Sequence, residues 1–146
     1  MIEENTNTNT VPTDPTDITP ALSGKKILIV EDDRFLHSLL SDKLKKSGVH
    51  VISAFDGETG LEEAAKSSPD LILLDIILPG VDGFSVLEKL KQDESLKKIP
   101  VIILSNLGQE EEIKKGTELG AAEFLIKANF TLDEIIEKLS SVLSKT

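Results

Sequence analysis

The sequence predicts an α/β fold in which helices cover both faces of one parallel sheet, and three observations support this. From Lys25 onward, short apolar runs alternate with segments of helical period, as in chains of βα units. Most of the runs are continuously apolar, as expected of strands covered on both faces. With 146 residues and 39% apolar content, the chain is large enough for one domain with a real core.

The amino-terminal 23 residues differ from the rest. They are rich in Thr, Asn and Pro, contain no Lys or Arg, and show no apolar period. Such a segment buries too little apolar surface to offset the entropy cost of ordering. We therefore expect a disordered acidic tail at residues 1–23 and one folded domain at residues 24–146.

Five β-rich runs are expected to form the sheet, at residues 27–30, 49–54, 71–74, 101–104 and 122–126. The first helix carries four leucines on one face and is expected to end near Gly48. These leucines are Leu36, Leu39, Leu40 and Leu44. The polar residues of this helix, including His37, are expected to face water.

The later helices differ in how well their apolar residues are spaced. The fourth is polar and is anchored by little more than Ile113 and Leu119, so it should be the least firmly held. The last has clean helical spacing in Leu132, Ile135, Ile136, Leu139, Val142 and Leu143.

Composition excludes several kinds of chemistry. The absence of cysteine rules out disulfides, thiolate nucleophiles and Cys-based metal sites, and two histidines offer little imidazole chemistry. A net charge of −10 argues against direct nucleic-acid binding, which needs clustered Lys and Arg. No apolar run approaches the roughly 20 residues of a membrane span, and the amino terminus does not read as a signal peptide. We expect a soluble, cytoplasmic protein without membrane contact.

The residues that follow the strands are the best candidates for function, because ligands of open parallel sheets bind beyond the carboxyl ends of the strands. After the first, third, fourth and fifth strands these residues are Glu31, Asp32 and Asp33, then Asp75, Ser105 and Lys127. Crowded carboxylates repel each other and stay ionised together only beside a positive charge. Oxygen ligands without His or Cys favour a hard ion, and Mg²⁺ suits phosphoryl chemistry.

This set of residues is suited to phosphoryl transfer. A metal and Lys127 can neutralise charge on a transferring phosphoryl group while the Asp75 carboxylate attacks it in line, and Ser105 can hydrogen-bond the product. Asp33 is better explained as the N-cap of the first helix. The acids after the first strand would repel a nucleotide phosphate, and the chain has neither GxGxxG nor a P-loop motif.

Four motifs in this order resemble the receiver domain of bacterial two-component response regulators, especially the stand-alone type without an output domain. The resemblance covers residues 25–144. Its motifs are Ile27-Leu28-Ile29-Val30-Glu31-Asp32-Asp33; Asp70-Leu71-Ile72-Leu73-Leu74-Asp75 followed by Leu78-Pro79-Gly80-Val81-Asp82-Gly83; Pro100-Val101-Ile102-Ile103-Leu104-Ser105; and Ala121-Ala122-Glu123-Phe124-Leu125-Ile126-Lys127.

The resemblance implies the strand order 2-1-3-4-5 and a role for each site residue. Asp75 would be the phosphoacceptor. Glu31 and Asp32 would hold Mg²⁺, or Mn²⁺ in its place, together with Asp75 and the backbone carbonyl of Ile77. Lys127 would pair with the phosphoryl group.

The resemblance also implies a switch and its partners. Ser105 would turn inward to the phosphoryl group, and Phe124 would follow into the space that Ser105 leaves. The phosphoryl group would come from a phosphohistidine on a sensor histidine kinase or phosphotransfer protein, and the altered surface would signal to a downstream effector protein. The chain would then be a signalling switch, with only self-directed phosphorylation and dephosphorylation, and not an enzyme acting on other substrates.

The chain departs from the family pattern at two positions. The family commonly has proline after the lysine, often with a cis bond, where this chain has Ala128. A cis bond before alanine costs about 2.5–4 kcal/mol, so the sequence leaves the path of this loop open. Asn106 stands where a small residue is usual and could alter the access of water to a phosphorylated aspartate.

Two other functions are compatible with an acidic site on such a sheet. One is a Mg²⁺-dependent phosphatase with an aspartyl nucleophile, but such enzymes usually place a second acid two residues after the nucleophile, where this chain has Ile77. The other is a binding scaffold that is never phosphorylated. Retention of the acids, the hydroxyl and the lysine together argues against a scaffold.

Overall fold

Five strands form one sheet in the computed structural model, which describes residues 20–145. They are β1 (Lys26–Val30), β2 (His50–Ala54), β3 (Leu71–Leu74), β4 (Val101–Ser105) and β5 (Glu123–Ile126). All neighbouring strands are parallel, and their order is β2-β1-β3-β4-β5. The predicted strands and the implied order are confirmed, and each boundary lies within one residue of its expected place.

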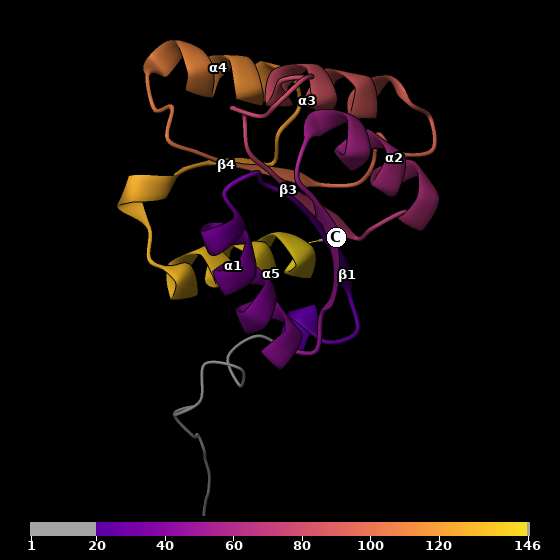
Figure 1. Ribbon diagram of the computed structural model, residues 1–146, viewed down its shortest axis with the longest axis vertical. Coiled ribbons are helices and arrows are strands. Elements are labelled where there is room, and N and C mark those ends of the chain that lie inside the picture. Colours follow the sequence, from indigo (N-terminus) through magenta and orange to yellow (C-terminus); the bar gives the residue numbers. More distant parts are fainter. Residues whose placement is uncertain (1–19, 146) are drawn as a thin grey trace, which may run out of the picture.

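Helices cover both faces of this sheet, as predicted. They are α1 (Arg34–Lys46), α2 (Gly57–Ser67), α3 (Gly83–Gln92), α4 (Glu110–Glu118) and α5 (Leu132–Ser144), with short 3₁₀ turns η2 (Pro20–Leu22) and η3 (Lys127–Asn129). Figure 1 shows α2, α3 and α4 on one side of the strands and α1 and α5 on the other. In the described part of the chain, no helix is long and apolar enough to span a membrane.

Two apolar clusters fill the layers, because alternate residues of a strand point to opposite faces. Ile27 and Ile29 of β1 belong to the cluster under α1 and α5. Leu28 and Val30 belong to the cluster under α2 and α3. The central strands are therefore buried on both sides, which explains their continuous apolar sequence.

Side-chain caps determine where the helices begin and thus how the loops above the sheet run. Asp33 accepts hydrogen bonds from the backbone N–H groups of Phe35 and Leu36, which confirms its predicted N-cap role. Asp56 and Asp82 cap α2 and α3 in the same way. The strand-to-helix loops at the carboxyl edge of the sheet are therefore held at the helix end as well as at the strand end.

The structure corrects two expectations. His37 was expected to face water but is 4% exposed, because its ring packs against Phe55, with ring centroids 4.5 Å apart. Leu22 falls in the predicted tail but is fully buried, where it joins the cluster under α1 and α5. The folded domain thus begins before residue 24, and residues 1–19 of the predicted tail lie outside the described residues.

Helix α4 buries little of its surface, as its sequence predicted. Gly116 is the buried residue of this helix. A Cβ atom on Gly116 would lie 2.8 Å from Ile103 and 2.9 Å from the Phe124 ring. The absence of a side chain therefore lets α4 approach the sheet closely, although the helix adds few apolar side chains to the core.

Leu22→Ala should lower the free energy of unfolding by about 2–5 kcal/mol, because it leaves a cavity in a packed core. Urea denaturation followed by far-ultraviolet circular dichroism would measure it, since the chain has no Trp or Tyr for fluorescence. Exposed Ser23 is the matched control, and Ser23→Ala should change stability by less than about 0.5 kcal/mol. Equal stabilities of the two variants would contradict the assignment of Leu22 to the core.

Candidate functional site

The carboxyl edge of the sheet gathers the predicted acids and the lysine. Glu31 and Asp32 follow β1, and Asp75 follows β3. Lys127 follows β5 and is the first residue of η3. Oxygen atoms of the three carboxylates lie within 4.8 Å of one another. The structure therefore brings together four of the residues that the sequence singled out.

Lys127 joins the two buried acids. Its Nζ lies 2.8 Å from Oε1 of Glu31 and 2.9 Å from Oδ2 of Asp75. The side chains of Glu31 and Asp75 are 4% and 6% exposed, and that of Lys127 is 16% exposed. One ammonium therefore serves two carboxylates in a place with little water.

The backbone fixes the direction of both buried carboxylates. Asp75 Oδ1 accepts hydrogen bonds from the N–H groups of Ile76, at 2.7 Å, and Ile77, at 3.3 Å. Glu31 Oε2 accepts one from the N–H of Asp33 at 3.0 Å. Each acid is therefore held through one oxygen by the backbone and through the other by Lys127.

The charges at this site do not balance, because one ammonium faces three carboxylates. Burial raises the pKa of Glu31 to about 7, and the Asp75 charge adds to this, while Lys127 and the Asp33 N–H oppose it. Burial lowers the pKa of Lys127, but its bonds to Glu31 and Asp75 outweigh burial and leave this pKa above its ordinary value. Lys127 is thus charged, and the raised pKa of Glu31 comes first from its burial.

This donor set fits a hard divalent cation. It consists of carboxylate oxygens without sulfur or imidazole, as Mg²⁺ and Mn²⁺ prefer. Three carboxylates share one ammonium at this site, so a cation would add the positive charge that they lack. Asp32 is exposed, so a cation bound beside it would keep positions open for water or a phosphate oxygen.

The remaining predicted residues, Ser105, Phe124 and Ile77, lie around this cluster, and Ile77 contacts Asp75 through its backbone N–H. Ser105 is fully buried at the end of β4, and its Oγ accepts a hydrogen bond from the Leu107 N–H at 3.3 Å. Phe124 is half-buried in β5 and packs beside Gly116. The Ile77 side chain is 60% exposed, while its N–H contacts Asp75.

The loop after Lys127 takes the form of the η3 turn. Within residues 20–145 no peptide bond is cis, so Lys127 is joined to Ala128 by a trans bond. Lys127 reaches both acids from this turn. Proline after the lysine is therefore not needed to place its ammonium here.

The close approach of Gly83 to Asp75 was not predicted from the sequence. A Cβ on Gly83 would lie 2.2 Å from the main-chain oxygen of Asp75 and 2.6 Å from the Cα of Ile76. The Gly83 N–H also donates to the Ile76 carbonyl at 2.8 Å. One feature of the sequence could have predicted it. Glycine has low helix propensity, so a glycine directly after the helix cap Asp82 suggests that packing requires it there.

Comparison with known proteins identifies the family. The model of the response regulator receiver domain matches residues 27–140. The chain belongs to this family. It is 39% identical, over 83% of its length, to the DNA-binding dual master transcriptional regulator RpaA of Synechocystis, and it spans about half of that protein, 50%.

Solved structures agree with this assignment. A putative response regulator from Chloroflexus aurantiacus is 30% identical with a TM-score of 0.76, over 82% of this chain and 98% of that chain. The Mn²⁺-bound form of response regulator Rcp1 is 31% identical with a TM-score of 0.72, over 80% and 92% of the two chains. Receiver domains are the phosphoacceptor switches of two-component signalling and bind a divalent metal in an acidic pocket, so this receiver domain has a phosphoacceptor role.

The affinity of the acidic pocket for a divalent cation such as Mg²⁺ should fall as pH drops below about 7. Glu31 holds a proton below its pKa of about 7, and as an expected ligand it would have to release that proton for the cation to bind. The apparent dissociation constant should then rise toward about tenfold per pH unit on the acidic side. Calorimetric titration at about pH 6 and pH 8 would measure this. The Glu31→Gln variant should bind the cation more weakly than the native protein at the higher pH, and its affinity should depend little on pH. Equal affinities of the native protein at both pH values would contradict this explanation.

Gly83→Ala should destabilise the domain by about 1–3 kcal/mol, because the new Cβ displaces the β3–α3 loop. Helix propensity alone predicts that the alanine would stabilise the domain by about 0.5–1 kcal/mol. Gly60→Ala is the control, since a Cβ there meets Val30 methyl groups at 3.0 Å and no backbone. Urea denaturation of both variants measures the difference, and a stabilised Gly83→Ala protein would show that the close approach is unimportant.

Proposed function

We propose that Asp75 accepts a phosphoryl group from a phosphohistidine on a sensor histidine kinase or phosphotransfer protein. The observation that carries this proposal is the arrangement of Asp75 itself. Its carboxylate is buried, oriented by two backbone N–H groups and paired with Lys127 beside two further acids. A carboxylate with a purely structural role would need the Lys127 ammonium as its partner, but it would not need two further acids beside it.

The proposed reaction is an in-line displacement at phosphorus. An Asp75 oxygen forms the new O–P bond while the P–N bond to the donor imidazole breaks, and the imidazole nitrogen keeps that electron pair. The product is an aspartyl phosphate. Lys127, 2.9 Å from Oδ2 of Asp75, can offset the negative charge of the reacting groups.

The three acids are proposed to hold Mg²⁺, with Mn²⁺ as an alternative. Glu31, Asp32 and Asp75 would supply carboxylate oxygens and Ile77 its backbone carbonyl. The bound cation would neutralise these acids and the oxygens of the transferring group. The donor set within 4.8 Å and the Mn²⁺-bound relative support this part of the proposal.

Lys127 is proposed to bind the phosphoryl group once it is attached. Its Nζ contacts the Asp75 oxygen Oδ2 and sits between the two buried acids. A phosphoryl group on Asp75 brings additional negative oxygens to the ammonium. Lys127 can then exchange its contact with Glu31 for one with the phosphoryl group while keeping its charge.

Ser105 and Phe124 are proposed to convert this event into a change at the surface. Ser105 is buried in the strand next to β3, and its present hydrogen bond to Leu107 is local. Exchange of that bond for one to the phosphoryl group would contribute about 1.5–3 kcal/mol. Phe124 packs beside Gly116, so its movement would act directly on α4.

The chain is thus proposed to be a switch whose own phosphorylation and dephosphorylation are its only reactions. Its output would be a downstream effector protein in the cytoplasm, without direct binding to DNA. The acidic charge of the chain supports a protein partner over a nucleic acid.

Incubation with acetyl phosphate and Mg²⁺, followed by intact mass spectrometry, tests the assignment of Asp75. The native protein should gain the mass of one phosphoryl group, and Asp75→Asn should gain none. Asp82→Asn is the matched control, because Asp82 lies in the same loop region, is exposed and can be replaced by asparagine as a helix cap. Absence of the adduct from the native protein, or its presence in Asp75→Asn, would refute the proposal.

A further inference from the structure

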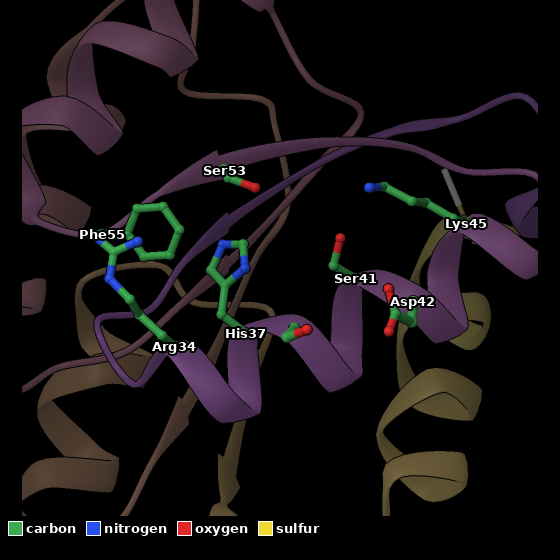
Figure 2. Close-up of a pocket in the computed structure, with 8 residues that line it drawn as sticks. Arg34, His37, Ser41, Asp42, Lys45, Ser53 and Phe55 are labelled. Atoms are coloured by element: carbon green, nitrogen blue, oxygen red, sulfur yellow. The ribbon is translucent and has the colours of Figure 1, made fainter.

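A second polar site lies between helix α1 and the edge strand β2, away from the phosphoacceptor site. We call it the α1–β2 groove, and Figure 2 shows its lining. Its volume is about 260 Å³. The lining side chains that matter here are Arg34, His37, Ser41 and Lys45 of α1, with Ser53 of β2 and Phe55 just after it.

The groove is unusual because it contains buried polar groups. Among the described residues, five polar or charged side chains are buried, and three of them belong to the phosphoacceptor site. The other two, His37 and Ser41, both line the groove, with exposures of 4% and 8%. A helix face turned toward a sheet normally buries apolar residues, so this pair requires an explanation.

His37 also has an unpaired ring nitrogen. Its Nε2 is buried and has no hydrogen-bond partner in the structure. Leaving such a group unpaired costs about 1–3 kcal/mol, and native proteins rarely keep that cost without a reason. Packing explains the position of the ring, since His37 lies against Phe55, but not the choice of a polar ring.

The charges around the groove favour a negative partner. Burial, with smaller contributions from Arg34 and Lys45, holds the pKa of His37 below its ordinary value, so its ring is neutral. The Arg34 guanidinium lies 4.0 Å from the centre of the Phe55 ring. Asp42 also lines the groove, so two cations, Arg34 and Lys45, stand against one carboxylate there.

Several hydrogen-bond donors converge on one space. Figure 2 shows the Lys45 ammonium turned back along the groove, above the Ser41 hydroxyl. The Ser53 hydroxyl and the His37 ring lie on the other side of the same space. A cation, two hydroxyls and a neutral imidazole provide donors that an anion with several oxygens can use together.

We propose that the α1–β2 groove binds a small oxyanion, held by Lys45, His37 and the hydroxyls of Ser41 and Ser53. Nε2 of His37 is closed to solvent as the groove now stands, so His37 reaches the anion when its ring turns toward the groove and donates in the tautomer that carries a proton on Nε2. A volume of about 260 Å³ admits phosphate or a carboxylate with a small organic group. It is below the roughly 300–1,000 Å³ of pockets for drug-sized ligands.

Proton NMR of the histidine rings tests this without further labels, because the chain has two histidines. Inorganic phosphate is added to the full chain in the absence of divalent cations, with sodium chloride at equal ionic strength as the reference. The His37 signal should shift saturably with phosphate. Exposed His50 at the start of β2 is the internal control and should respond as it does to chloride.

A parallel titration with acetate distinguishes the ligand class. Saturation by phosphate alone identifies a phosphate site, and saturation by acetate as well identifies a general oxyanion site. Either result supports the proposal. Absence of a saturable His37 shift with both anions overturns it.

Two lysine variants locate the bound anion. Lys45→Ala should weaken phosphate binding about tenfold or more, as expected for loss of a charge-assisted hydrogen bond. Lys46 is exposed, adjacent and outside the groove, so Lys46→Ala should leave the affinity unchanged. Both lysines are at the surface, so the fold should survive either change. Equal affinities of the native and Lys45→Ala proteins would overturn the proposal.

Discussion

A single ammonium, that of Lys127, is shared by two carboxylates that have little access to water. Lys127 leaves the end of β5, while its two partners Glu31 and Asp75 follow β1 and β3. This arrangement ties three strand ends together across the sheet. Removal of Lys127 would leave two buried carboxylates without their cation, and breaking a buried ion pair in this way typically costs about 3–5 kcal/mol. The same arrangement leaves negative charge in excess, which the proposed cation would neutralise before the proposed phosphoryl transfer.

The backbone around this ion cluster is held in place as firmly as the charged side chains are. Asp75 is held by the amides that follow it, and the loop beyond passes so close that Gly83 has no room for a side chain. Helix caps at Asp33 and Asp82 hold the far ends of the adjoining loops. The Asp75 carboxylate is therefore oriented before any partner arrives, which would reduce the reorganisation that the proposed transfer requires.

Much of the fold could be predicted from sequence because its cause is local. Continuous apolar runs identify strands covered on both faces, and the topology then places Asp75, Glu31 and Lys127 at one edge. Other features depend on residues distant in the chain. Leu22 is one apolar residue in a polar segment, and its burial depends on helices that form much later. His37 lies beyond the leucine stripe of α1, and only the position of Phe55 determines that its ring is covered.

The path of the loop after Lys127 also depends on residues distant in the chain. Motif order places the lysine, but neither the sequence nor the cost of a cis bond determines the path of the residues that follow. The hydrogen bonding of Ser105 is a second example. Its place at the end of β4 could be predicted, whereas its present bond to Leu107 depends on how the next loop turns.

Helix α4 meets the sheet through Gly116 and contributes few apolar side chains to the core. Segments with so few buried contacts open locally at a free energy well below that of global unfolding. Backbone amides of α4 are therefore expected to exchange with solvent deuterium sooner than those of the central strands. A free-energy change too small to disturb the sheet can therefore shift the population of α4 conformations. Helix α4 would in this way respond to the phosphorylation proposed at Asp75 while the core stays intact.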